Sequence, residues 1–200
     1  MKRRAVLNLG AGAGIFVLAA GHGLAALAAD DRLLLADLEP DGLWPIYRRY
    51  RLLIVGQRDD EAASAFARSV VDVLARALPT SRAQLARAAD ARRVGVLIGT
   101  SQQDVAIMAA HSAEALFLAK APFEDIRNVP LRVIVSFGSH VLVCREDLVA
   151  GHAYLLARTL AQHKDALPAP AGAPQGIVPT HPGSQAFFAG AEMPHSTSVA

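Results

Sequence analysis

Four short apolar runs constrain the fold of this chain more than any other feature. They are RLLIVG at 51–56, RVGVLI at 93–98, LRVIVSF at 131–137 and HVLVC at 140–144. Short apolar runs bounded by Gly, Pro and polar residues are typical of buried strands. The segments between them are longer and carry apolar residues every three or four positions, which predicts amphipathic helices. Strands that alternate with helices predict an α/β fold with a mostly parallel sheet flanked by helices.

The predicted helices begin at polar residues that favour helix N-termini. These residues are Asp59 or Asp60, Ser81, Thr100 or Ser101, and Asp147. Pro79 ends the first of these helices, and the second, rich in alanine, is expected to reach about Ala89. His181-Pro182-Gly183 predicts a structural turn near the end of the chain.

The chain divides into four predicted parts. Residues 1–28 carry a basic start, an uncharged stretch and a terminal Ala-Leu-Ala, which predicts an export signal peptide. The pair Arg3-Arg4 within it is similar to a twin-arginine signal. Residues 29–50 form a lead-in segment, residues 51–190 the α/β domain, and residues 191–200 a disordered tail. We therefore expect a periplasmic protein, with an uncleaved membrane anchor as the alternative.

Charge argues against nucleic acid as a partner. The whole chain has 20 basic and 18 acidic residues, but three of the basic ones are Lys2, Arg3 and Arg4 in the predicted signal. Removing them leaves 17 basic residues against 18 acidic ones, so the mature chain carries a net charge of about −1. No basic stripe remains to neutralise phosphates.

Two sequence positions suit a ligand. In parallel sheets, the loops that follow the strands form the ligand crevice. Gln57 and Arg58 follow the first predicted strand, and Arg58 can bind a carboxylate with two hydrogen bonds. Thr100, Ser101 and Gln102 follow the second and would place backbone N–H groups at a helix N-terminus, where anions bind. The alternatives are a simple helix cap and a solvated arginine paired with Asp59 or Asp60.

Catalysis and metal binding have weaker support in the sequence. Nucleotide-binding, zinc-protease, serine-hydrolase and Cys-x-x-Cys motifs do not occur in it, so we expect no enzyme activity and no cofactor. His140 and Cys144 lie four apart on a predicted strand and hence on one face, which a soft metal could use. Because no third ligand shows a recognisable spacing, we expect a buried structural cysteine and no metal.

Three stretches of the chain resemble a known family. They are VGVLIGTSQQDVAIMAA from Val94, LRVIVSFGSHVLVCREDLVAGHAYLLARTL from Leu131 and IVPTHPGSQAFFAGAEMP from Ile177. In this order they resemble periplasmic solute-binding proteins of the TAXI type, which serve tripartite (TRAP) transporters. The resemblance implies one lobe of a periplasmic-binding-protein-like (type II) fold, because the residues of a second lobe are missing.

The resemblance also implies a function. We expect an exported, non-catalytic protein that binds a small carboxylate-type solute or a periplasmic partner protein through a one-lobe cleft. Transporter membrane subunits are the further partners that the resemblance implies. The alternative is an accessory or structural partner of a periplasmic complex, such as a dehydrogenase, in which the ligand site is lost. A small enzyme or metal protein that uses His140 and Cys144 is a third hypothesis.

Overall fold

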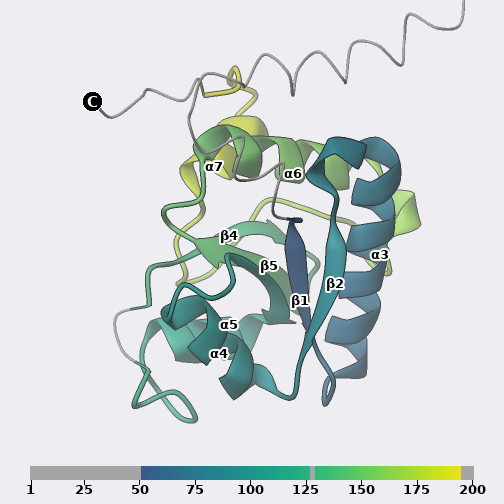
Figure 1. Ribbon diagram of the computed structural model, residues 1–200. Coiled ribbons are helices and arrows are strands. Elements are labelled where there is room, and N and C mark those ends of the chain that lie inside the picture. The colour runs from purple at the N-terminus through teal and green to yellow at the C-terminus, as the bar shows by residue number, and fades with distance from the viewer. Residues whose placement is uncertain (1–50, 127–128, 195–200) are drawn as a thin grey trace, which may run out of the picture.

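The computed structural model describes residues 51–126 and 129–194, and Figure 1 shows their arrangement. The predicted signal peptide and lead-in segment lie outside the described residues, as do residues 195–200 of the predicted tail. Residues 191–194 contain no helix or strand, but Ala191 accepts a hydrogen bond from the Tyr154 hydroxyl (3.1 Å). No helix among the described residues combines the length and the apolarity that a membrane crossing requires.

Five strands form one mixed sheet in the order β2-β1-β3-β5-β4. Their bounds are Leu53–Gln57 (β1), Gln84–Ala88 (β2), Val105–Ala109 (β3), Leu131–Ser136 (β4) and His140–Arg145 (β5). β1 runs parallel to both β2 and β3, whereas β5 runs antiparallel to both β3 and β4. The α/β class is confirmed. The expectation of a mostly parallel sheet is wrong for the half of the sheet formed by β5 and β4, whose pairings are antiparallel. Only three residues, 137–139, join β4 to β5, and so short a connection allows only antiparallel pairing.

The first strand–helix unit follows the sequence prediction. β1 leads into α3 (Glu61–Ala77), and the Asp60 carboxylate caps this helix by accepting the Ala63 N–H (2.9 Å). The buried residues of α3 recur at helical spacing and pack on one face of the sheet. A short 3₁₀ helix, η1 (Pro79–Ser81), follows because proline cannot continue the α-helix.

The next unit reverses the prediction. The expected helix from Ser81 to Ala89 is instead the edge strand β2, and the expected strand at 93–98 lies within helix α4 (Ala91–Gly99). Asp90 caps α4 by accepting the Arg93 N–H (2.7 Å), and Val94 and Ile98 then face the core one turn apart. The apolar run at 93–98 therefore lies in a helix. A short apolar run by itself does not distinguish a buried helix from a buried strand.

The predicted third helix divides into two elements. Residues 105–109 form the fully buried strand β3, and only then does α5 (Ala110–Phe117) begin. β3 lies between β1 and β5, and its side chains are buried on both faces of the sheet, against α3 on one side and against α4 and α5 on the other. A strand buried on both faces carries a continuous apolar run, and VAIMA at this position has that pattern.

The β4–β5 hairpin and the following helix confirm the sequence prediction. Gly138 adopts a positive φ of 80° in the turn, which glycine tolerates without strain. The expected helix is α6 (Ala150–Gln162), but Asp147 does not cap it. The Asp147 carboxylate instead forms two hydrogen bonds with the Arg145 guanidinium (3.0 and 3.1 Å).

The segment after α6 covers the β4 edge of the sheet. It contains the 3₁₀ helix η2 (Lys164–Ala166) and helix α7 (Pro182–Phe188). Between them, Gly172 pairs with Ser136 and Thr180 pairs with Val133, so backbone groups at this edge are bonded. α7 then packs against α6. The expected turn at 181–183 is the beginning of α7.

Candidate functional site

The two predicted ligand positions lie at opposite ends of the parallel strands β1 and β3. Gln57 and Arg58 are at the C-terminal end of β1. β3 begins at Val105, which pairs with Ile54 near the start of β1. The segment 100–102 precedes β3 and therefore lies at the N-terminal edge of these parallel strands. The structure does not bring the two groups together.

Residues 100–102 follow a helix C-terminus, so the expectation that they begin a helix is wrong. Thr100 is the C-cap of α4, and both its N–H (2.9 Å) and its hydroxyl (2.7 Å) donate to the Val96 carbonyl. Ser101 has a positive φ of 57°, and the Gln102 amide donates to the Thr100 hydroxyl (3.0 Å). Because a helix C-terminus presents carbonyl groups and partial negative charge, the argument for an anion here no longer applies.

Gln57 and Arg58 differ strongly in exposure. Gln57 is 3% exposed, and its amide nitrogen has no hydrogen-bond partner among the described residues. Its backbone carbonyl accepts the Ser64 hydroxyl. The Arg58 side chain is exposed, and within residues 51–126 and 129–194 it has no ion pair. The alternative of an arginine paired with Asp59 or Asp60 is therefore not what the structure shows.

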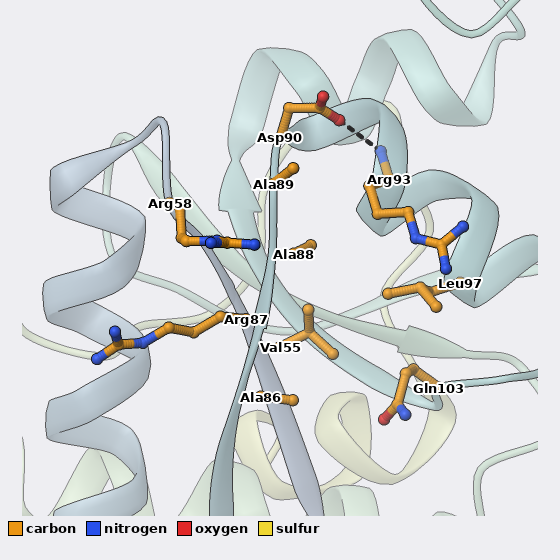
Figure 2. A pocket seen from close by; sticks show the side chains of 10 residues that line it. All are labelled: Val55, Arg58, Ala86, Arg87, Ala88, Ala89, Asp90, Arg93, Leu97 and Gln103. Carbon is orange, nitrogen blue, oxygen red and sulfur yellow. Dashed lines mark hydrogen bonds between the residues drawn. The ribbon is translucent and has the colours of Figure 1, made fainter.

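Arg58 lies beside a surface hollow of about 520 Å³. The hollow lies on the α4 side of β1 and β2, and Figure 2 shows ten residues that line it. Val55, Ala86, Ala88 and Leu97 supply apolar surface, and the charged lining residues include Arg58, Asp90 and Arg93. In Figure 2 the Arg58 side chain extends toward β2, whereas the Arg87 side chain extends the other way, toward α3.

The electrostatics of the hollow favour a small anion. Arg58 and Arg93 are both exposed, and neither has an ion-pair partner in the part of the chain that the structure describes. The Asp90 carboxylate accepts the Arg93 N–H and so caps the N-terminus of α4. That helix end adds partial positive charge, which Asp90 offsets in part. The lining contains three arginines (Arg58, Arg87 and Arg93) against one acid, Asp90, so the hollow is positive.

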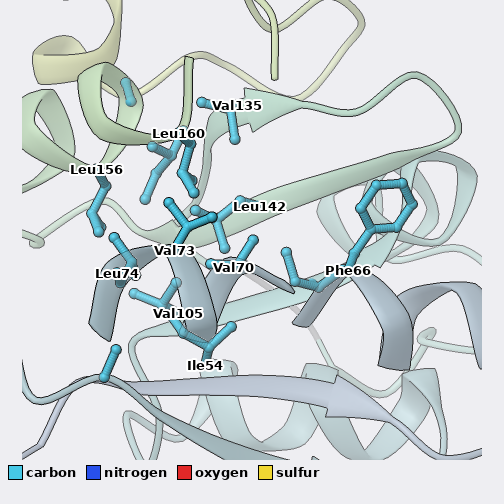
Figure 3. Packing of buried hydrophobic residues seen from close by; sticks show 14 of the residues in the cluster. Ile54, Phe66, Val70, Val73, Leu74, Val105, Val135, Leu142, Leu156 and Leu160 are labelled. Carbon is cyan, nitrogen blue, oxygen red and sulfur yellow. The ribbon is translucent and has the colours of Figure 1, made fainter. Parts of the chain in front are cut away.

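The opposite face of the sheet is closed by α3 and α6. Figure 3 shows side chains from both helices packed over the sheet. At one end of this cluster Phe66 stacks on Phe137 (centroids 4.9 Å apart) and lies 5.3 Å from the His140 ring. Apolar packing therefore fills this face.

A chain of hydrogen bonds joins α3 to the β4–β5 turn. His140 Nε2 lies 2.9 Å from the Asp60 carboxylate, and His140 Nδ1 lies 3.0 Å from the Ser139 hydroxyl. Burial raises the pKa of Asp60, but hydrogen bonds from the Ala63 N–H and from His140 outweigh it and hold that pKa below its usual range. The order Asp-His-Ser is that of a hydrolase triad, but the hollow lined by Arg58 does not include these residues. Their clear effect is to tie the N-terminus of α3 to the hairpin.

His140 and Cys144 lie on one face of β5, and both are buried. Burial strongly raises the pKa of the Cys144 thiol, which disfavours the thiolate needed for nucleophilic attack or metal binding. No group of three or more His, Cys, Asp or Glu side chains converges within the described residues.

Sequence reasoning missed Asp90 and Arg93. Both were hidden by the prediction of a strand at 93–98, since a strand would not place them at a helix N-terminus. The available signal was Asp90 itself, an N-cap residue just before a run whose buried residues Val94 and Ile98 are four apart.

Comparison with protein-family models and with curated proteins identified no relative of this chain. A scan of the chain against protein-family models found no match, and no curated protein is significantly similar to it.

Proposed function

We propose that the protein is an exported, non-catalytic solute-binding protein that holds a small carboxylate in the hollow beside Arg58 and Arg93. One observation carries the proposal: a hollow of about 520 Å³ with apolar surface is lined by two exposed arginines that form no ion pair with any described residue. Ligand pockets are typically about 300–1,000 Å³ and combine apolar walls with a few polar groups.

The residues of the hollow have distinct roles in this proposal. The Arg58 and Arg93 guanidinium groups bind the ligand carboxylate, because their planar donors match its two oxygens. Val55 and Leu97 contact the apolar part of the ligand, and the Gln103 amide orients a second polar group. The N-terminus of α4 adds attraction for the negative charge.

The resemblance to TAXI-type proteins of TRAP transporters suggests the same class of function. The domain would then be a single lobe of a type II periplasmic-binding fold, and a five-stranded mixed sheet flanked by helices is compatible with it. Two-lobed receptors close around their ligand, whereas a single lobe leaves it open to water. We therefore expect weak binding, with Kd about 0.1–1 mM, and transporter membrane subunits as partners.

An accessory role in a periplasmic complex has less support. Such a role would need an exposed apolar patch. Among the described residues, the exposed large hydrophobic side chains are Leu118 (40%) and Ile177 (55%).

A calorimetric titration tests the proposed site. Acetate, butyrate, succinate and glutamate are each titrated into the protein and into its Arg58→Ala, Arg93→Ala and Arg68→Ala variants. We expect at least one carboxylate to bind, and each of the first two substitutions to weaken it about tenfold or more, since a hydrogen bond to a charged group contributes about 1.5–3 kcal/mol. Arg68, exposed on α3, is the matched control and should change nothing. Failure of all four to bind, or equal affinity in the Arg58 and Arg93 variants, would contradict the proposal.

A further inference from the structure

The two edges of the sheet are treated differently in the structure. At the β4 edge, Gly172 and Thr180 pair with Ser136 and Val133. At the other edge, β2 pairs with β1 alone among the described residues. An open strand edge presents unpaired backbone groups, which proteins usually cover or protect.

The backbone groups at the open edge can be identified. The Gln84 N–H donates to Leu52 (2.9 Å), and the Ala88 carbonyl accepts the Arg58 N–H (3.0 Å), so both residues bond toward β1. Backbone groups of successive strand residues point alternately to the two sides. Leu85 and Arg87 therefore direct their N–H and C=O groups away from β1.

The side chains of β2 give this edge a distinct chemistry. Leu85 packs against the core on the α3 side, and Ala86 packs on the α4 side. Arg87 is exposed, lies on the same side as Leu85, and has no ion-pair partner within residues 51–126 and 129–194. A covering strand should thus carry apolar residues on both faces and an acid opposite Arg87.

The segment 34–38 of this chain has the required sequence. It reads Leu-Leu-Ala-Asp-Leu, and residues 30–41 contain five acidic residues and one arginine. Set parallel to β2, with residue 34 opposite residue 84, it places Leu35 beside Leu85 and Asp37 beside Arg87. Ala36 then lies beside Ala86 on the α4 side.

The described part of the chain begins close to this edge. The Arg51 guanidinium donates to the Gln84 side chain (2.9 Å), so residue 51 lies beside the first residue of β2. The twelve residues 39–50 can span up to about 40 Å, and the five residues of β2 extend about 17 Å. A tether of this length keeps the segment at an effective concentration of about a millimolar.

We propose that residues 34–38 add a sixth strand to the sheet, parallel to β2, with Asp37 paired to Arg87. Arg87 is also among the residues that line the hollow. The strand proposal still does not require a bound solute, because it uses the outer edge of β2 and the face that Arg87 shares with Leu85. Its occupant is this chain itself rather than another protein.

Amide hydrogen exchange in the full chain tests the proposal. We expect the Leu85 and Arg87 amides to exchange at least about 100-fold more slowly than unpaired amides. Arg87→Glu should reduce this protection about tenfold or more, and adding Asp37→Lys to it should restore the protection. Lys120→Glu, a charge reversal at an exposed position after α5, is the control and should have no effect. The melting temperature of each variant reports that it is folded.

Three outcomes would overturn the proposal. The first is exchange of both amides at nearly the unpaired rate in the full chain. The second is protection that rises with protein concentration, which would make a second copy the occupant. The third is loss of protection in the Arg87→Glu variant that Asp37→Lys does not restore.

Discussion

At the scale of single residues, His181 shows how a buried polar side chain can organise a helix end. The ring is 1% exposed, Nε2 lies 2.8 Å from the Leu148 carbonyl, and Nδ1 accepts the Gly183 N–H (3.2 Å). A carbonyl can only accept and an N–H can only donate, so these partners require the neutral ring with its proton on Nε2. Burial lowers the pKa of His181, which agrees with that state.

This neutral histidine predicts a pH dependence of stability. Because its pKa is lower in the folded than in the unfolded chain, the unfolded chain binds the proton more readily. The stabilisation is fully present above the unfolded value of about 6.5 and is lost as pH falls below it toward the folded pKa. We expect the melting temperature to fall between pH 7 and pH 5 more steeply in the native protein than in His181→Asn. Parallel pH profiles would refute this role.

Gly183 allows α7 to approach α6 closely. A Cβ at this position would lie 1.8 Å from the Ala150 carbonyl oxygen, so Gly183→Ala requires the two helices to separate. We expect a loss of about 2–4 kcal/mol in the free energy of unfolding, measured by urea denaturation. Gly172→Ala is the matched control, because its Cβ would meet nothing closer than 4.0 Å and should cost about 1 kcal/mol or less. Equal losses in the two variants would contradict this account.

At the scale of elements, sequence pattern predicted those segments whose local signals agree with their tertiary environment. β1, α3, the β4–β5 hairpin and α6 combine apolar periodicity with a turn or helix terminus nearby. β2 was missed because Ala and Arg have weak strand propensity, and its pairing with β1 decided the outcome. α4 was missed because Val and Ile favour strands locally, whereas the Asp90 cap and packing of one face made a helix.

Two helix caps of the same kind should contribute unequally to stability. Among the described residues, the Asp90 carboxylate accepts only the Arg93 N–H, so Asp90→Ala should cost about 1 kcal/mol. Asp60 caps α3 and also bonds His140, so Asp60→Ala should cost more, by about 1 kcal/mol or above. Urea denaturation of both variants measures the difference. An Asp60 variant as stable as the Asp90 variant would show that the His140 contact contributes nothing.

At the scale of the whole molecule, the candidate site could be predicted only in part. Arg58 was predicted because the residue after a buried strand is a common place for ligand contacts. Arg93 comes from α4, and it lines the same hollow as Arg58 because that helix packs beside β1 and β2. We assigned residues 100–102 to the site because we expected a helix to begin there, whereas α4 ends there. Placing the site correctly therefore required predicting that residues 91–99 form a helix rather than a strand.

The central claim is that the hollow beside Arg58 and Arg93 binds a small carboxylate. The most direct test is a titration of the ¹⁵N-labelled protein with succinate, followed by the backbone amide chemical shifts. We predict saturable shifts at Arg58, Ala88, Asp90 and Arg93, with the amides of α7, which lines no part of the hollow, unchanged. Shifts confined to other parts of the molecule, or no saturable shift up to about 20 mM succinate, twenty times the weakest Kd expected, would contradict the account.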